Sequence, residues 1–184
     1  SVQVAMMYLL GFRIAADKGT PMDWCRRQLP KLLNAVSYLP HVLAMEPEFF
    51  RYAEGLKNAE HLFYLGRGLD YSLAMEGSLK LKEISYIHSE AYAAGELKHG
   101  TISLIEDGRL VVAVLTQPEL YKKTISNIQE VKTRGAFVMA VTTVGNTEVE
   151  KVADYVVYLP ETNPIFANSL AIIPLQLFGY YVSI

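Results

Sequence analysis

The sequence is poor in the features that mark several classes of protein. It has a single cysteine, Cys25, which excludes an internal disulfide framework and favours a reducing compartment. Its 17 basic and 19 acidic residues give a net charge of -2 without a basic stripe, so we expect no nucleic-acid partner. No signal peptide is evident. We therefore expect a cytoplasmic location.

Charged residues are also absent from segment 162–184, which is long enough to cross a bilayer. Asparagine, proline and glutamine residues interrupt this segment, and no basic residue follows it. We interpret it as a buried helix and expect no membrane partner, with a membrane span as the alternative. Because the chain lacks an initiator methionine, we expect it to be a piece of a longer protein.

The 184 residues, of which 51% are hydrophobic, suit one globular domain with an appendage. Three helices are predicted first, over 3–16, 22–37 and 46–56, with breaks marked by Pro40 and Pro47. Strands then alternate with helices. The predicted strands are 61–65, 110–115, 136–142 and 155–159, and the predicted helices are a segment capped by Asp70, 118–134, 148–153 and a final helix after Pro164.

This alternation predicts an α/β fold with a parallel sheet covered on both faces. Ligands of such sheets usually bind beyond the carboxyl ends of the strands, where residues 66–68 (Gly-Arg-Gly) and 116–118 are expected. The backbone amides of 66–68 could contact a phosphate, but a tight turn explains the same residues equally well. Segment 88–109 is predicted to be a long loop of the kind that carries functional residues.

Three side chains of one predicted helix, Glu76, Lys80 and Glu83, have the spacing of a single helical face. His99 lies in the loop that follows. A carboxylate beside an ammonium, with an imidazole nearby, is a set that can move protons on a sugar. The alternative is an exposed ion pair and a solvated histidine. We see no metal-ligand spacing, since His88 and Glu90 are isolated, and we expect neither a metal nor another cofactor.

The segment EGSLKLKEISYIHSEAYAAGELKHG, residues 76–100, resembles the glutamine–fructose-6-phosphate aminotransferase family. Segments 63–88, 127–131 and 163–181 extend the resemblance over nearly the whole chain. It implies the isomerase half of such an enzyme, which has two sugar isomerase (SIS) domains in tandem. The expected fold is a flavodoxin-like three-layer SIS domain. The implied domains are 1–19, the last helix of a preceding lobe; 20–55, a helical linker; and 56–184, the SIS domain.

The resemblance also implies roles for the three candidate residues. Glu83 falls on the glutamate that shuttles a proton between two sugar carbons, and Lys80 on the lysine beside it. His99 falls on the histidine that opens the sugar ring in the active site of the neighbouring subunit, which implies a homodimer. The implied ligands are fructose 6-phosphate and glucosamine 6-phosphate. By chemistry alone, Lys80 can stabilise negative charge on a sugar oxygen.

Some features of the family are missing or altered. The loops that hold the phosphate, the glutaminase domain and the C-terminal tail with its imine-forming lysine are absent from this chain, so we expect the chain alone to be inactive. Thr101 stands where proline is expected in many relatives. Two alternatives remain: a stand-alone SIS module that senses a sugar phosphate, and a purely structural lobe that dimerises.

Overall fold

The structure is a computed structural model that describes residues 2–54 and 59–184. Within this part of the chain, one sheet has the strand order β2-β1-β3-β4-β5, and every pair of neighbours is parallel. The strands are β1 (His61–Gly66), β2 (His88–Ala93), β3 (Leu110–Leu115), β4 (Phe137–Thr143) and β5 (Tyr155–Leu159). This is the flavodoxin-like order, and it confirms the predicted α/β class.

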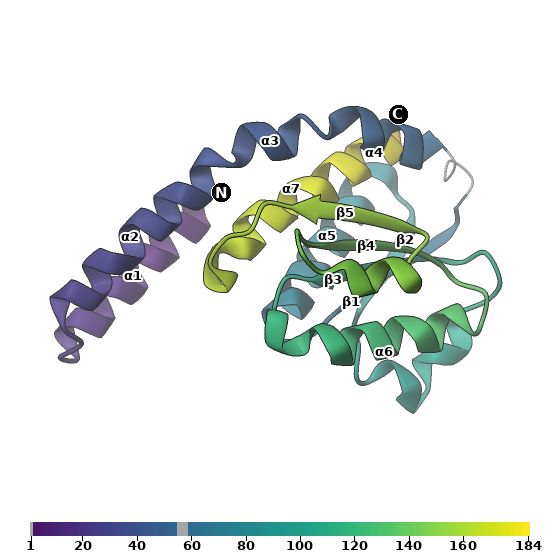
Figure 1. Ribbon diagram of the computed structural model, residues 1–184. Helices are drawn as coiled ribbons and strands as arrows, with labels where there is room; N and C mark the ends of the chain where they lie inside the picture. Colours follow the sequence, from purple (N-terminus) through teal and green to yellow (C-terminus); the bar gives the residue numbers. More distant parts are fainter. Residues whose placement is uncertain (1, 55–58) are drawn as a thin grey trace.

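Helices cover both faces of the sheet (Figure 1). α4, α5 and α7 lie over one face, whereas α6 lies over the other. The described helices are α1 (Val2–Asp17), α2 (Met22–Ser37), α3 (Leu39–Leu43), α4 (Glu46–Glu54), α5 (Leu69–Ser85), α6 (Tyr121–Lys132) and α7 (Pro164–Ser183), with short 3-10 turns η1 (Leu97–His99), η2 (Thr101–Leu104), η3 (Pro118–Leu120) and η4 (Thr147–Lys151).

Alternating side chains of the strands divide the core into two layers. Leu62, Tyr64 and Val112 point into the layer that contains α5 and α7, and Phe63 and Val111 point into the layer that contains α6. All six residues of β3 are buried, as predicted for a strand covered on both faces. A one-residue slip in register would exchange the two layers, so burial on both sides fixes the pairing.

The prediction of a long loop over 88–109 is wrong for residues 88–93, because these residues form β2, which pairs with β1 at the edge of the sheet. The sequence of this strand, HSEAYA, contains polar and small residues, and most of its side chains remain partly exposed. An edge strand does not need a continuous apolar run, which is why hydrophobic periodicity missed it. The predicted end of the second helix at residue 37 is confirmed by α2. The sequence did not predict α3, whose first turn contains Pro40, where the missing N–H costs nothing.

α7 has the length and hydropathy of a membrane span. In this fold Phe166, Leu170, Leu175 and Phe178 are buried in the core layer that α7 shares with α5, as predicted for a buried helix. The helix begins at Pro164 and is capped by Asn163, whose Oδ1 accepts a hydrogen bond from the Ile165 amide at 3.1 Å.

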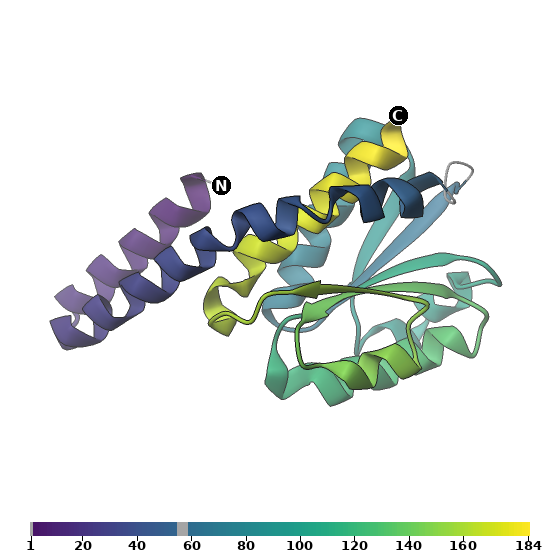
Figure 2. The ribbon, with the colours of Figure 1, turned by 45° about the horizontal axis from the view of Figure 1, so that its top comes forward.

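α1 and α2 form a hairpin that extends away from the sheet (Figure 2). Tyr8 makes one of the contacts between the hairpin and the rest of the fold: its ring packs edge-on against Phe166, and its hydroxyl donates to the Ile165 carbonyl at 3.0 Å. Ala35 of α2 is also buried in the core layer that contains α7. Much of its apolar surface is exposed, including Met6, Met7 and Leu10. The predicted end of the third helix at residue 56 and the boundary between 55 and 56 lie outside the described residues.

The turn from β1 into α5 requires glycine at position 66. A Cβ atom there would lie 2.3 Å from the Asp70 carbonyl oxygen, which belongs to the backbone and cannot move aside. By contrast, a Cβ at Gly11 on the exposed hairpin would have no neighbour within 4 Å.

We therefore expect Gly66→Ala to lower the free energy of unfolding by about 3 kcal/mol through overpacking. Gly11→Ala, the matched control, should raise helix stability by up to about 1 kcal/mol. Urea denaturation of both variants tests this. Equal effects of the two substitutions would contradict the close approach of α5 to β1.

Candidate active site

α5 carries two of the three candidate residues. The Lys80 ammonium is 2.8 Å from Oε2 of Glu83 and 3.7 Å from Oε1 of Glu76. The side chain of Lys80 is 32% exposed and that of Glu83 is 49% exposed, so a ligand can reach both. The structure thus brings together the carboxylate and the ammonium that the helical spacing predicts.

The hydrogen bond to Glu83 raises the pKa of the Lys80 ammonium, and the charge of Glu76 adds to the effect. Lys80 therefore stays positively charged at neutral pH. A permanent cation can stabilise negative charge on a neighbouring oxygen, but it is a poor proton carrier. In this pair the carboxylate of Glu83 is the group suited to accept a proton.

The Lys80–Glu83 pair lies toward the amino edge of the sheet, opposite the edge at which such sheets usually bind ligands. α5 starts beside the carboxyl end of β3, where Asp70 contacts Thr116, and returns to the amino ends of β1 and β2, where β2 begins at His88. Glu83 is 13 residues beyond Asp70, which corresponds to about 20 Å along a helix. Lys80 and Glu83 therefore lie far from the carboxyl edge, where sheets of this kind usually bind ligands.

His99 lies elsewhere. It ends η1, which follows the carboxyl end of β2, and its side chain is 64% exposed. Leu97, two residues earlier, is buried in the core layer of α6, whereas α5 covers the opposite face of the sheet. Among the described residues, the polar contact of His99 is with Glu96 at 4.0 Å, and none joins it to Lys80 or Glu83. One chain does not assemble the three residues into one site.

Thr101, the residue that departs from the family pattern, follows directly. Gly100 has φ 150° and ψ -53°, and Thr101 then begins η2. The Thr101 hydroxyl donates a hydrogen bond to the Leu97 carbonyl at 3.3 Å. This bond ties η2 to η1, so threonine stabilises the turn through its side chain.

The Gly-Arg-Gly segment forms a tight turn at the carboxyl edge. Arg67 donates from Nε to Oδ1 of Asn127 on α6 at 3.0 Å. Its guanidinium also covers Gly95, where a Cβ would lie 2.6 Å from Nη2. The Arg67 side chain thus bridges three segments of the fold, an arrangement that accounts for the arginine without a bound phosphate.

Asp70 is not the helix cap predicted from the sequence; Gly68, with φ 57°, occupies the cap position. The Asp70 carboxylate is buried and accepts hydrogen bonds from the Thr116 amide at 2.8 Å and the Thr116 hydroxyl at 2.5 Å. Asn168 of α7 joins the group through the Thr116 hydroxyl at 3.1 Å and the Leu69 carbonyl at 2.9 Å. These bonds fix the start of α5.

Sequence reasoning missed this network, although it contained a signal. Asp70 and Thr116 each follow a strand closely, and β1 and β3 are neighbours in the sheet. Polar residues just beyond the carboxyl ends of adjacent parallel strands come close together. The cap hypothesis considered Asp70 only within its own helix.

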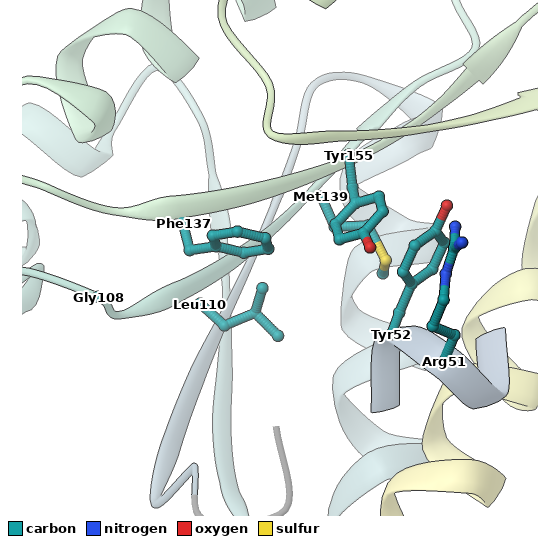
Figure 3. Close-up of a pocket in the computed structure, with 7 residues that line it drawn as sticks. All are labelled: Arg51, Tyr52, Gly108, Leu110, Phe137, Met139 and Tyr155. Carbon is teal, nitrogen blue, oxygen red and sulfur yellow. The ribbon is translucent and has the colours of Figure 1, made fainter. Parts of the chain in front are cut away.

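A separate cavity of about 330 Å³ opens at the amino ends of β3, β4 and β5 (Figure 3). Its walls are mostly aromatic and aliphatic, and Arg51 of α4 lies at its margin over the Tyr52 ring, at 5.3 Å from the ring centroid. The remaining lining residues are Gly108, Leu110, Phe137, Met139 and Tyr155. None of the three candidate residues lines this cavity.

Comparison with known families matches residues 55–184 to the model described as "SIS domain". The chain belongs to the SIS domain family.

Two similar proteins from different organisms have the same name. The chain is 46% identical over 188 residues to glutamine–fructose-6-phosphate aminotransferase [isomerizing] of Caldanaerobacter subterraneus subsp. tengcongensis. That match covers 100% of this chain and 30% of the relative, so the chain spans about a third of the length of such proteins. A match to the protein of the same name from Methanosarcina acetivorans has 40% identity over 186 residues, with 100% of this chain and 30% of the relative covered.

Among solved structures, the C-terminal domain of glucosamine-fructose-6-phosphate aminotransferase from Francisella tularensis superposes with a TM-score of 0.86. It is 37% identical, and the match covers 94% of this chain and 49% of that one. The sugar isomerase domain of an RpiR transcription factor from Sphaerobacter thermophilus has a TM-score of 0.66 at 17% identity, covering 83% of this chain and 89% of that one. The second likeness shows the shared fold alone.

The Asp70 network generates a stability prediction. Asp70→Ala would leave the buried Thr116 amide without an acceptor, whereas Asp70→Asn retains one oxygen. We expect the alanine variant to be about 1–3 kcal/mol less stable than the asparagine variant in urea denaturation at pH 7. Equal stabilities would mean that the Thr116 amide finds another partner.

The same network predicts a pH dependence. Burial raises the pKa of Asp70, and the hydrogen bonds from Thr116 only partly oppose that change. The folded state then holds this proton more tightly than the unfolded chain does. Relative to Asp70→Asn, the wild type should therefore gain stability as the pH falls through the folded-state pKa toward about 4, the usual value. A parallel pH series of denaturation curves measures the difference. A wild type that instead loses stability relative to Asp70→Asn would reverse the assigned direction.

Proposed function

We propose that this chain is the second SIS domain of an enzyme that makes glucosamine 6-phosphate and glutamate from fructose 6-phosphate and glutamine. Its part in that reaction is to supply proton-transfer residues for the ketose–aldose isomerisation. The observation that supports this most directly is the Lys80–Glu83 pair, with 2.8 Å between ammonium and carboxylate and both side chains accessible. The names of the similar full-length proteins supply the substrates.

The chemistry of the pair fits an aldose–ketose shift. Such a shift removes a weakly acidic proton from the carbon next to a carbonyl or imine and returns it to the neighbouring carbon. The Glu83 carboxylate would accept and return that proton. Lys80, held as a cation by its hydrogen bond to Glu83, would stabilise the negative charge that develops on the sugar oxygen.

The position of the pair supports a site completed by another part of the protein. Lys80 and Glu83 project from the last turns of α5, away from the carboxyl edge of their own sheet, so a neighbouring lobe would have to supply the groups that hold the sugar phosphate. The proposed layout has residues 1–19 as the last helix of that preceding lobe and 20–55 as a linker. The exposed apolar side chains of α1, among them Met6, Met7 and Leu10, support a helix whose packing partner lies outside this chain.

His99 extends the proposal to a homodimer. Its place beyond the carboxyl end of β2, with Leu97 anchored on the opposite face of the sheet from α5, supports action in a site other than that of its own Glu83. A histidine titrates near neutral pH and can deliver a proton to the ring oxygen of a cyclic sugar. We infer that each subunit lends His99 to the active site of its partner.

A stand-alone module that senses a sugar phosphate is the second candidate, and the likeness to the RpiR domain concerns its fold only. The 37% identity and TM-score of 0.86 to an aminotransferase C-terminal domain favour the enzyme. The same comparison weighs against a lobe with a purely structural role.

Glu83→Gln tests the assignment of the base. In the complete enzyme we expect proton exchange at the sugar carbons, followed by NMR in deuterated water, to fall at least about 100-fold while sugar binding survives. Glu148→Gln is a matched control, because Glu148 also pairs with a lysine three residues away, Lys151, at 2.7 Å on an exposed turn. Normal exchange in Glu83→Gln would remove Glu83 from the proposed mechanism.

His99→Asn tests the role in ring opening. We expect the variant of the complete enzyme to lose about 100-fold in kcat/KM with a cyclic sugar phosphate and much less with an open-chain analogue, because only the ring needs a proton donor. His41→Asn serves as the control for replacing an exposed histidine. Equal losses on the two substrates would show that His99 does something other than open the ring.

A further inference from the structure

Two histidines that are 27 residues apart in the sequence meet at the amino edge of the sheet. β1 and β2 are parallel neighbours, and their register pairs His61 with His88. The Nδ1 atoms of the two rings are 3.3 Å apart, and the ring planes cross at 81°. Both side chains are exposed to solvent. The pair is therefore held by two strands of a rigid sheet and is open on its outer side.

A carboxylate further along β2 lies beside the ring of His88. Oε1 of Glu90 is 3.5 Å from Nε2 of His88, and the other carboxylate oxygen of Glu90 accepts a hydrogen bond from the Tyr92 hydroxyl. Burial, together with this bond, raises the pKa of Tyr92 to about 12, so the hydroxyl stays protonated and continues to donate. His88, Glu90 and Tyr92 are two residues apart in the strand and so lie on one face.

The position of Glu90 favours one tautomer of His88. A carboxylate at Nε2 favours a proton on Nε2, which leaves the lone pair of Nδ1 directed at His61. The same order of groups, carboxylate then imidazole then metal, is found around protein-bound metal ions, where the carboxylate fixes the tautomer of the ligand. In the metal-free chain, His61 can donate its own Nδ1 proton to that lone pair.

We propose that His61 and His88 form a binding site for a divalent late transition-metal ion such as Zn²⁺ or Cu²⁺. Two nitrogens each 2.0–2.1 Å from a tetrahedral zinc ion are separated by about 3.3–3.4 Å. The Nδ1–Nδ1 distance of 3.3 Å matches this separation without any rearrangement of the sheet. Binding would replace the hydrogen bond between the rings, and the ring proton of His61 would move from Nδ1 to Nε2 by exchange with solvent, so that both imidazoles stay neutral.

The site would hold its ion with two protein ligands. Across residues 2–54 and 59–184, no group of three or more His, Cys, Asp or Glu side chains is arranged to hold a metal. Water would fill the remaining positions, so we expect dissociation constants in the micromolar range. Imidazole ligands favour Cu²⁺ over Zn²⁺ and give Mg²⁺ nothing to bind.

This inference reverses the expectation, drawn from the sequence, that His88 and Glu90 are too isolated for a metal. It does not depend on the proposed enzymatic function, because neither histidine belongs to the Lys80–Glu83 pair. An ion at this position would also link β1 to β2, the edge strand.

Calorimetric titration of the untagged chain with ZnCl₂, CuCl₂ and MgCl₂ tests the proposal. We expect one Zn²⁺ or Cu²⁺ per chain, tighter binding of Cu²⁺, a higher melting temperature in the presence of either ion, and no binding of Mg²⁺. His61→Asn and His88→Asn should each weaken Zn²⁺ binding at least about 10-fold. Glu90→Gln should weaken it about 10-fold while leaving one ion per chain.

His41→Asn is the matched control, because it also removes an exposed histidine but lies on α3, away from the pair. It should bind Zn²⁺ as the wild type does. Thermal unfolding of each metal-free variant reports whether the substitution itself disturbs the fold. Unchanged Zn²⁺ affinity in both His61→Asn and His88→Asn, or an equal loss in His41→Asn, would overturn the proposal.

Discussion

The hydrogen bonds from Thr116 to the buried Asp70 carboxylate are the constraint on which the arrangement of the candidate site depends. They hold the first turn of α5 against the carboxyl end of β3, and Gly66 allows the chain to turn tightly enough to reach that position. Once its start is fixed, α5 must cross the sheet and end at the amino edge. Lys80 and Glu83 are consequently displayed on a rigid helix and not on a flexible loop.

The direction of α5 places the candidate residues Lys80 and Glu83 at the opposite edge of the sheet from the Asp70–Thr116 network. The carboxyl edge of the sheet is occupied by the side chains of Arg67, Asp70 and Thr116. Asp70 accepts hydrogen bonds from Thr116, while Arg67 bonds to α6 and Thr116 to α7. The Lys80–Glu83 pair faces outward at the other end, and His99 lies on a third part of the surface. Such an arrangement suits a domain whose residues complete sites built largely by its neighbours, as the proposed function requires.

Much of the fold could be predicted from the sequence, because β1, β3, β4 and β5 are mostly apolar runs and the helix that became α6 has an amphipathic pattern. β2 could not, since an edge strand with partly exposed side chains lacks that signal. The ion pair on α5 followed from helical spacing, which is local. The Asp70–Thr116 network and the His61–His88 pair depend on strand neighbours and register, and those are properties of the assembled sheet.

The central claim is that this chain contributes Glu83 and Lys80 to a sugar-phosphate site that it does not complete alone. Calorimetric titration with glucosamine 6-phosphate, run on the chain alone and on the complete enzyme, tests this most directly. The account predicts saturable binding to the complete enzyme and none to the chain at the same concentrations. Binding of equal affinity to the chain alone, abolished by Glu83→Gln, would show that the site is self-contained and would contradict the account.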